Sequence, residues 1–427
     1  MKNKDRGFTL VELLAVIVIL AVILVIAVPK VSEVINSSKK ASFESSAKTI
    51  AAQAEKKKME KEILEDTGSI NCSDVVKLND TDYGNCSISF DGNTAKVTLV
   101  GKGKFKGLKI TNGTKDNAKA EEIKAPVYGN AVNYVNGLYA YDASSNGLEK
   151  DTTSDANIRY VGANPNNYVE FNNELWRIIG IFNGNVKLVR DDILTTYSFD
   201  NKTTAQGIET DYGTNDWTNS YLREFLNDYY FSGKTITCHS EAIGASTATN
   251  ATITCPEINK INATARSMIQ KTTWTLGGTT YKTSNPPYET YTVNELYESE
   301  RGTQVYSKHA TTSTDYIGLI FPSDYGYAST DASCRQNLRS GLTYTNNAYG
   351  GTPTCKNNNW LFKGVWYWTI LPHSSYAYDV FFVFSDGGLH HSQVLYRESV
   401  RPSLYLKSDI KIVSGSGTKD DAFKLEI

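Results

Sequence analysis

The residues with the clearest chemical role lie at the start of the chain. Residues 1–7, MKNKDRG, form a short basic leader that ends in Gly7, and an apolar run extends from Phe8 to Val28. The only charged side chain in that run is Glu12. A run of this length can cross a bilayer of about 30 Å as a helix. A carboxylate inside it is costly in lipid, so Glu12 is expected to have a specific partner.

The order of leader, glycine and apolar run differs from an ordinary secretory signal, in which small residues follow a shorter apolar stretch. Here the glycine comes first, and the run continues through a proline into a polar helix. Residues 1–66 resemble the N-terminus of type IV prepilins and pseudopilins. The residues that carry this resemblance are Gly7, Phe8, Thr9, Leu10, Glu12 and Pro29.

The resemblance implies that a prepilin peptidase cuts between Gly7 and Phe8, that Phe8 is then N-methylated, and that Pro29 kinks the helix. It also implies other pilin subunits as partners and the membrane as the location before assembly. After cleavage, Glu12 would lie one helical turn from the new amine. The amine of a neighbouring subunit is therefore its expected partner. The alternative is an uncleaved signal anchor with Glu12 near the lipid headgroups.

The six cysteines occur as three close pairs, and none forms a C-x-x-C motif. An even number of paired cysteines on a chain exported from the cytoplasm is typical of disulfides. Pairing in sequence order is the simplest arrangement, although other pairings and free thiols are alternatives. It predicts the disulfides Cys72–Cys86, Cys238–Cys255 and Cys334–Cys355.

No pattern in the chain indicates a metal site, a cofactor or catalysis. His390 and His391 are adjacent, and neighbouring residues on a strand point to opposite faces. The chain contains neither the EF-hand pattern nor the G-x-S-x-G motif of a nucleophilic serine. We therefore expect no metal, no cofactor and no enzymatic activity.

Tyrosines in polar segments are candidates for ligand contact. Tyr325 and Tyr327 flank a glycine, whereas Tyr376 and Tyr378 follow two serines. A third tyrosine-containing segment covers residues 281–288. Tyrosine with serine, glycine and asparagine is typical of binding loops. Ordinary surface loops are the alternative interpretation.

Length and charge restrict the possible functions further. A chain of 427 residues predicts two or three domains. The 44 basic and 46 acidic residues give a net charge of −2, which provides no whole-chain signal for binding nucleic acid.

The pattern along the chain predicts an α+β protein. After the leader, residues 8–66 are expected to form one long membrane and filament helix. Residues 67–124 alternate apolar and polar side chains around turns and predict a small antiparallel, pilin-like meander. Residues 125–157 are polar and turn-rich, which suggests a partly ordered linker; a docked helix or strand over Tyr128–Tyr141 is the alternative. All six tryptophans follow, in a mainly β region predicted over residues 158–427.

This last region resembles C-type-lectin-like surface domains of cell-envelope proteins. The matching segments are residues 173–182, 215–227, 366–370, 384–389 and 400–412. The resemblance implies a compact, loop-rich fold whose ends lie close together, and it leaves the ligand open.

Together, these features predict a minor pilin or pseudopilin-like subunit of a type IV pilus-like filament. It would be a single-pass membrane protein before assembly and would then lie on the cell surface. Its C-terminal module would bind a surface protein or glycan. One alternative is a filament-initiating or capping subunit of a secretion or DNA-uptake machine, and another is an envelope-anchored enzyme.

Overall fold

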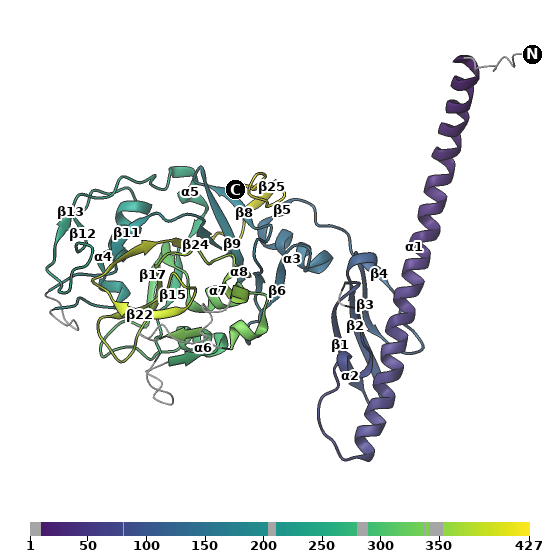
Figure 1. Ribbon diagram of the computed structural model, residues 1–427, viewed down its shortest axis with the longest axis horizontal. Coiled ribbons are helices and arrows are strands. Elements are labelled where there is room, and N and C mark those ends of the chain that lie inside the picture. The colour runs from purple at the N-terminus through teal and green to yellow at the C-terminus, as the bar shows by residue number, and fades with distance from the viewer. Residues whose placement is uncertain (1–9, 80, 204–210, 280–288, 337, 341–352) are drawn as a thin grey trace, which may run out of the picture. The chain divides into compact units, whose positions relative to one another are not determined.

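The computed structural model describes residues 10–427 except for 80, 204–210, 280–288, 337 and 341–352 (Figure 1). The chain divides into two compact units, Met1–Ala125 and Pro126–Ile427. Each unit has its own hydrophobic core, so each is described by itself.

The first unit consists of one long helix and a small antiparallel sheet with strand order β1-β2-β3-β4. Its elements are α1 (Leu10–Ile63), α2 (Cys72–Val75), β1 (Tyr83–Asp91), β2 (Thr94–Gly101), η1 (Gly103–Phe105), β3 (Leu108–Gly113) and β4 (Glu121–Glu122). The helix and the antiparallel meander predicted from the sequence are therefore both present.

The second half of α1 packs on the sheet through one apolar stripe. Each member of the stripe lies three or four residues from another member, so they share one helix face. On the sheet side, every second residue of β2 is buried. The buried helix residues are Phe43, Ala47, Ile50, Ala51 and Ala54, and they meet Ala95, Val97 and Leu99 of β2.

The second unit is built around an eleven-stranded sheet. Its main path is β14-β24-β10-β9-β8-β26-β25-β5, with β18 beside β24, β7 beside β9 and β6 beside β7. The strands are β5 (Gly129–Asn130), β6 (Leu148–Lys150), β7 (Ile158–Tyr160), β8 (Tyr168–Phe171), β9 (Glu174–Phe182), β10 (Asn185–Arg190), β14 (Ile269–Gln270), β18 (Ile317–Leu319), β24 (Pro402–Leu406), β25 (Lys411–Ser414) and β26 (Phe423–Glu426).

A five-stranded sheet of order β11-β23-β20-β21-β22 lies in the same unit; Figure 1 labels its two edge strands. Its strands are β11 (Thr195–Ser198), β20 (Tyr367–Pro372), β21 (Asp379–Val383), β22 (Leu389–Gln393) and β23 (Arg397–Val400). Three two-stranded pairs complete the strands: β12 (Cys238–His239) with β13 (Thr252–Ile253), β15 (Thr272–Thr275) with β17 (Thr312–Asp315), and β16 (Glu289–Tyr291) with β19 (Leu338–Ser340).

Short helices connect these strands, and the tight turn between β8 and β9 is formed by two asparagines. The longest helix of the second unit is α3 (Ala131–Asp142). The others are η2 (Trp217–Asn219), α4 (Tyr221–Glu224), the π-helical η3 (Phe225–Phe231), α5 (Ala263–Met268), α6 (Val293–Arg301), α7 (Pro322–Tyr327), η4 (Ala332–Arg335) and α8 (Pro353–Asn357). Asn172 and Asn173 adopt φ angles of 58° and 59° between β8 and β9, which is the backbone of a tight hairpin turn that asparagine tolerates.

The structure corrects the predicted linker over residues 125–157. The boundary between the units falls after Ala125. The following segment contains α3 and β6, and β5 pairs with β25 near the C-terminus. Val135 and Leu148 of this segment are buried in the core of the second unit. The segment is polar because much of its surface faces solvent, although its few apolar residues complete the core.

A buried charge cluster fastens this segment to the rest of the second unit. Asp151 Oδ2 accepts a hydrogen bond from Arg159 Nε at 2.6 Å. Arg159 Nη1 and Lys187 Nζ contact the two carboxylate oxygens of Asp324 at 2.8 and 2.5 Å. Burial acts to raise the pKa of Asp324, but the charges of Lys187 and Arg159 hold that pKa below its usual range.

Removal of one charge from this cluster is expected to lower the stability of the second unit. Asp151→Asn leaves the Arg159 guanidinium only partly compensated inside the protein, so we expect the free energy of unfolding to fall by about 3–5 kcal/mol. Chemical denaturation of the full chain near neutral pH, followed by tryptophan fluorescence, measures the change because all the tryptophans lie in the second unit.

The matched control is Asp420→Asn, which alters an exposed carboxylate of the same unit. It should change the free energy of unfolding by less than about 0.5 kcal/mol. Equal stability of the two variants would show that residues 126–157 are not held to the unit by this cluster.

Candidate functional site

The residues of the predicted processing site lie at the edge of the described chain. Gly7 and Phe8 fall outside the described residues. Glu12 and Pro29 lie within α1, whose helical backbone extends from Leu10 to Ile63. The cleavage, the methylation and the kink at Pro29 stay predictions.

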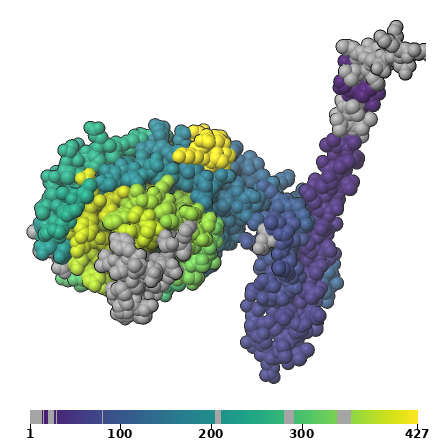
Figure 2. All heavy atoms as spheres, viewed as in Figure 1, coloured from purple at the N-terminus to yellow at the C-terminus, as the bar shows by residue number. Residues whose placement is uncertain are grey.

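The first half of α1 presents apolar side chains to solvent. It stands clear of the strands of the first unit (Figure 2). Leu14, Ile17 and Ile19 are 61%, 56% and 59% exposed, and Val31 and Val34 further along the helix are 56% and 68% exposed. Several exposed apolar side chains on one element are typical of a surface that another molecule covers. Among the described residues, no helix is both long and apolar enough to span a membrane.

The three predicted disulfides are confirmed. Cys72–Cys86 connects α2 to β1 in the first unit, and the Cα atoms are 6.1 Å apart. Cys238–Cys255 and Cys334–Cys355 lie in the second unit, with Cα separations of 5.2 and 5.6 Å. Each disulfide closes a short loop and can stabilise its unit by about 3 kcal/mol.

Two of the four proposed ligand-binding tyrosines are core residues instead. Tyr325 and Tyr327 lie in α7 and are 0% and 1% exposed. The Tyr325 hydroxyl donates a hydrogen bond to Gly387 O at 2.8 Å. Gly326, which suggested a loop, lies so close to the Val293 and Leu338 side chains that a Cβ atom there would clash with both. The glycine therefore permits close packing, and the binding-loop interpretation is wrong for Tyr325 and Tyr327.

The other two tyrosines lie at the surface near a polar cluster. Tyr376 is 38% exposed and Tyr378 is partly buried, and their ring centroids are 5.8 Å apart. Beneath them, Asn215 Nδ2 donates to the carbonyl oxygens of His373, Tyr376 and Asp379 at 3.0, 2.8 and 2.7 Å. The Asn215 amide thus fixes the backbone of the tyrosine loop. Ligand contact by this loop stays a prediction.

The histidines of β22 separate as expected for neighbours on a strand. His391 Nδ1 lies 2.8 Å from Asp379 Oδ2, whereas the His390 ring contacts the Phe384 ring at 4.7 Å. In the described part of the chain, no three or more His, Cys, Asp or Glu side chains are grouped to hold a metal ion.

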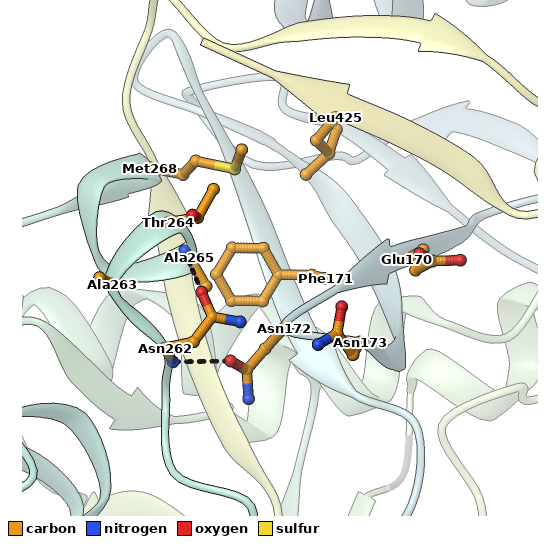
Figure 3. Close-up of a pocket in the computed structure, with 10 residues that line it drawn as sticks. All are labelled: Glu170, Phe171, Asn172, Asn173, Asn262, Ala263, Thr264, Ala265, Met268 and Leu425. Atoms are coloured by element: carbon orange, nitrogen blue, oxygen red, sulfur yellow. Dashed lines mark hydrogen bonds between the residues drawn. The ribbon is translucent and has the colours of Figure 1, made fainter.

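A shallow pocket of about 560 Å³ opens between the β8–β9 turn, α5 and β26 (Figure 3). Asn262 N–H donates to Asn172 Oδ1 at 2.8 Å, and Asn262 Oδ1 accepts from Ala265 N–H at 2.9 Å. These two bonds fix the side chains on one wall. Phe171, Met268 and Leu425 supply the apolar part of the lining.

The chemistry of this pocket suits an uncharged polar group. Its volume falls within the range of about 300–1,000 Å³ that is usual for small-molecule sites. The amides of Asn173 and Asn262 can donate and accept hydrogen bonds. The one charged lining residue, Glu170, forms an ion pair with Lys424. Sequence reasoning missed the pocket, because α5 reaches it from about ninety residues away without a local signal.

Comparison with known proteins found two family models that match the chain. One is described as the prokaryotic N-terminal methylation motif and matches residues 2–28. The other is described as a domain of unknown function, DUF6273, and matches residues 183–408, more than half of the chain. The chain belongs to the DUF6273 family. No curated protein and no solved structure matched it.

The DUF6273 match covers only part of the second unit. It begins at Asn183, between β9 and β10, and ends shortly after β24. Phe171 and Leu425 of the pocket lie outside the match, whereas Asn262 lies inside it. The resemblance to C-type-lectin-like domains stays a prediction, because neither comparison tests it.

The different burial of the tyrosines predicts losses of stability of different size for two substitutions. Tyr325→Ala removes a fully buried ring and its hydrogen bond, so the melting temperature should fall strongly, by an equivalent of about 3–5 kcal/mol. Tyr376→Ala acts on a partly exposed ring and should cost less than about 1 kcal/mol. Thermal denaturation followed by near-UV circular dichroism compares the two, and similar small losses would show that Tyr325 is not part of the core.

Proposed function

We propose that this DUF6273 protein is a minor pilin or pseudopilin-like subunit of a type IV pilus-like filament. The observation that carries the proposal is the N-terminal methylation motif, which the family model places over residues 2–28. The motif implies processing by a prepilin peptidase and assembly with other pilin subunits. In this proposal the chain is membrane-anchored before assembly and lies in a surface filament afterwards.

The exposed face of α1 supports the assembly role. The apolar side chains of Leu14, Ile17, Ile19, Val34 and Ile35 lie outside the core of the first unit. Covering apolar surface stabilises an assembly by about 25 cal/mol per Å². Neighbouring helices in a filament would cover this face and would also exclude water around Glu12. The Glu12 carboxylate would then need the amine of a neighbouring Phe8 as its partner.

The second unit is the part that the filament would display. It has its own core and two disulfides, and its pocket and its tyrosine loop offer surfaces for recognition. We propose adhesion to, or recognition of, a surface protein or glycan as its role, without catalysis. A filament-initiating or capping role is the alternative if the folded unit binds no such ligand.

Replacement of Glu12 tests the assembly role. Glu12→Ala should leave insertion in the membrane intact, because removal of a charge favours the apolar environment. It should lower the amount of the chain in sheared filaments about tenfold or more, because the amine of the next subunit loses its counter-charge. An immunoblot of the filament and membrane fractions measures both amounts.

The matched control is Glu33→Ala, which removes an exposed carboxylate from the same helix. It should leave incorporation close to that of the unaltered chain, because its ion pair with Lys30 is solvent-exposed. Normal incorporation of Glu12→Ala, or an equal loss in both variants, would contradict a specific role for Glu12.

A further inference from the structure

Four side chains form a row across one face of the five-stranded sheet. Tyr367 of β20 is the register partner of Ser399 in the parallel strand β23. Trp366 directly precedes β20, and its carbonyl oxygen accepts a hydrogen bond from Ser399 N–H at 3.2 Å, so the pairing extends to this residue. Because side chains alternate along a strand, this register places Trp366 and Glu398 next to each other on the opposite face. On the other side of Trp366, its ring stacks on Phe384 with centroids 4.5 Å apart, and Phe384 contacts His390.

Trp366 lies at the surface, and its ring is held in place. It is 38% exposed, whereas the five other tryptophans of the chain are buried. Its indole Nε1–H donates a hydrogen bond to Ser385 Oγ at 2.9 Å. This bond and the stacking on Phe384 fix the ring before any ligand arrives. A preorganised aromatic surface loses little conformational entropy on binding.

Glu398 is a half-buried carboxylate that nothing within the described residues neutralises. It forms no hydrogen bond or ion pair there, and burial alone raises its pKa to about 7. The adjacent Arg397 turns away, since its Nε donates to Thr196 O at 3.2 Å. A buried carboxylate without a partner is costly. Such a group is a frequent mark of a binding site.

The titratable groups on the neighbouring elements do not supply the missing charge. Tyr197 is the register partner of Glu398 in β11, and its hydroxyl accepts a hydrogen bond from His239 N–H. On α4, which packs on β11, Glu224 is itself acidic, and Arg223 Nη2 pairs with Asp315 Oδ1 at 2.7 Å. At the other end of the row, His390 Nε2 lies 4.0 Å from Asp386 Oδ2. None of these described groups therefore forms an ion pair with Glu398.

We propose that Glu398 and Trp366 bind the ammonium group of a lysine side chain from a partner protein. The face of an indole ring attracts a cation, and the carboxylate supplies the counter-charge. Because Glu398 is only partly accessible, a slender alkyl chain with a primary ammonium reaches it better than a bulky quaternary ammonium. The methylene groups of lysine can lie along the exposed indole. The proposal extends the recognition role given above, and its test does not depend on filament assembly.

The test uses the full chain in an uncharged detergent, with 15N-labelled tryptophan. Trp366→Phe assigns the indole N–H signal of Trp366. Nα-acetyl-lysine methylamide should shift this signal saturably at about pH 8, and the norleucine analogue, which lacks the charge, should not. Binding should weaken as the pH falls through about 7, because protonation of Glu398 removes the counter-charge.

Glu398→Gln should weaken lysine binding roughly tenfold or more. The variant should still fold, since the raised pKa means that ionised Glu398 destabilises the folded state above about pH 7. The variant should therefore melt at a higher temperature than the unaltered chain at about pH 8, and the difference should shrink as the pH approaches the ordinary value for glutamate. Glu426→Gln, an exposed carboxylate on β26, is the control and should bind lysine normally.

The proposal would be overturned by the absence of a saturable shift, by equal binding of the norleucine analogue, or by unchanged lysine binding in Glu398→Gln. Tighter binding of choline than of the lysine derivative would also contradict it, because the site would then favour a quaternary ammonium. None of these outcomes bears on the assembly role of Glu12, so the two proposals fail separately.

Discussion

One continuous helix imposes the main physical constraint on the first unit. The segment of α1 from Phe43 to Ala54 is covered by the meander, whereas Leu14, Ile17 and Val34 in its first half expose apolar side chains. The sheet is too small to cover both segments, because its strands meet only the second half of the helix. The remaining apolar face therefore requires either lipid or other protein. The methylation motif at the start of the same helix indicates that both are met in turn, first the membrane and then a filament.

The second unit depends on buried charges as well as on apolar packing. Asp324 lies between Arg159 and Lys187, and Arg159 also holds Asp151. Residues that are far apart in sequence are thereby joined at one point in the core. This cluster explains why the folded unit begins near Pro126, well before the DUF6273 match at residue 183. A fragment that begins at residue 158 would lack Asp151 and leave the Arg159 charge poorly compensated.

Local patterns predicted the features that depend on near neighbours. The helical spacing of apolar residues from Phe43 onward predicts the long helix, and the alternation in β2 predicts the meander that packs on it. The short sequence separation of the cysteines in each pair predicts the three disulfides. Features that depend on distant contacts were missed. The local composition of residues 125–157 suggests a linker, because the pairing of this segment with β25 is not visible locally. Tyr325 and Tyr327 were interpreted as loop residues because α7 is short and contains a glycine, whose role is close packing against Val293. The position of Glu398 in β23, next to Trp366, likewise follows only from the strand register.

The central claim is that this chain is processed and assembled as a pilin-like subunit. Intact-mass spectrometry of the protein isolated from its native host tests the claim most directly. The account predicts a mature chain that begins at Phe8 and carries one added methyl group on its N-terminal amine. A variant with Gly7→Val should keep the leader, because a branched side chain fills the space left for glycine. A native chain that still begins at Met1, or one that is cut elsewhere, would contradict the account.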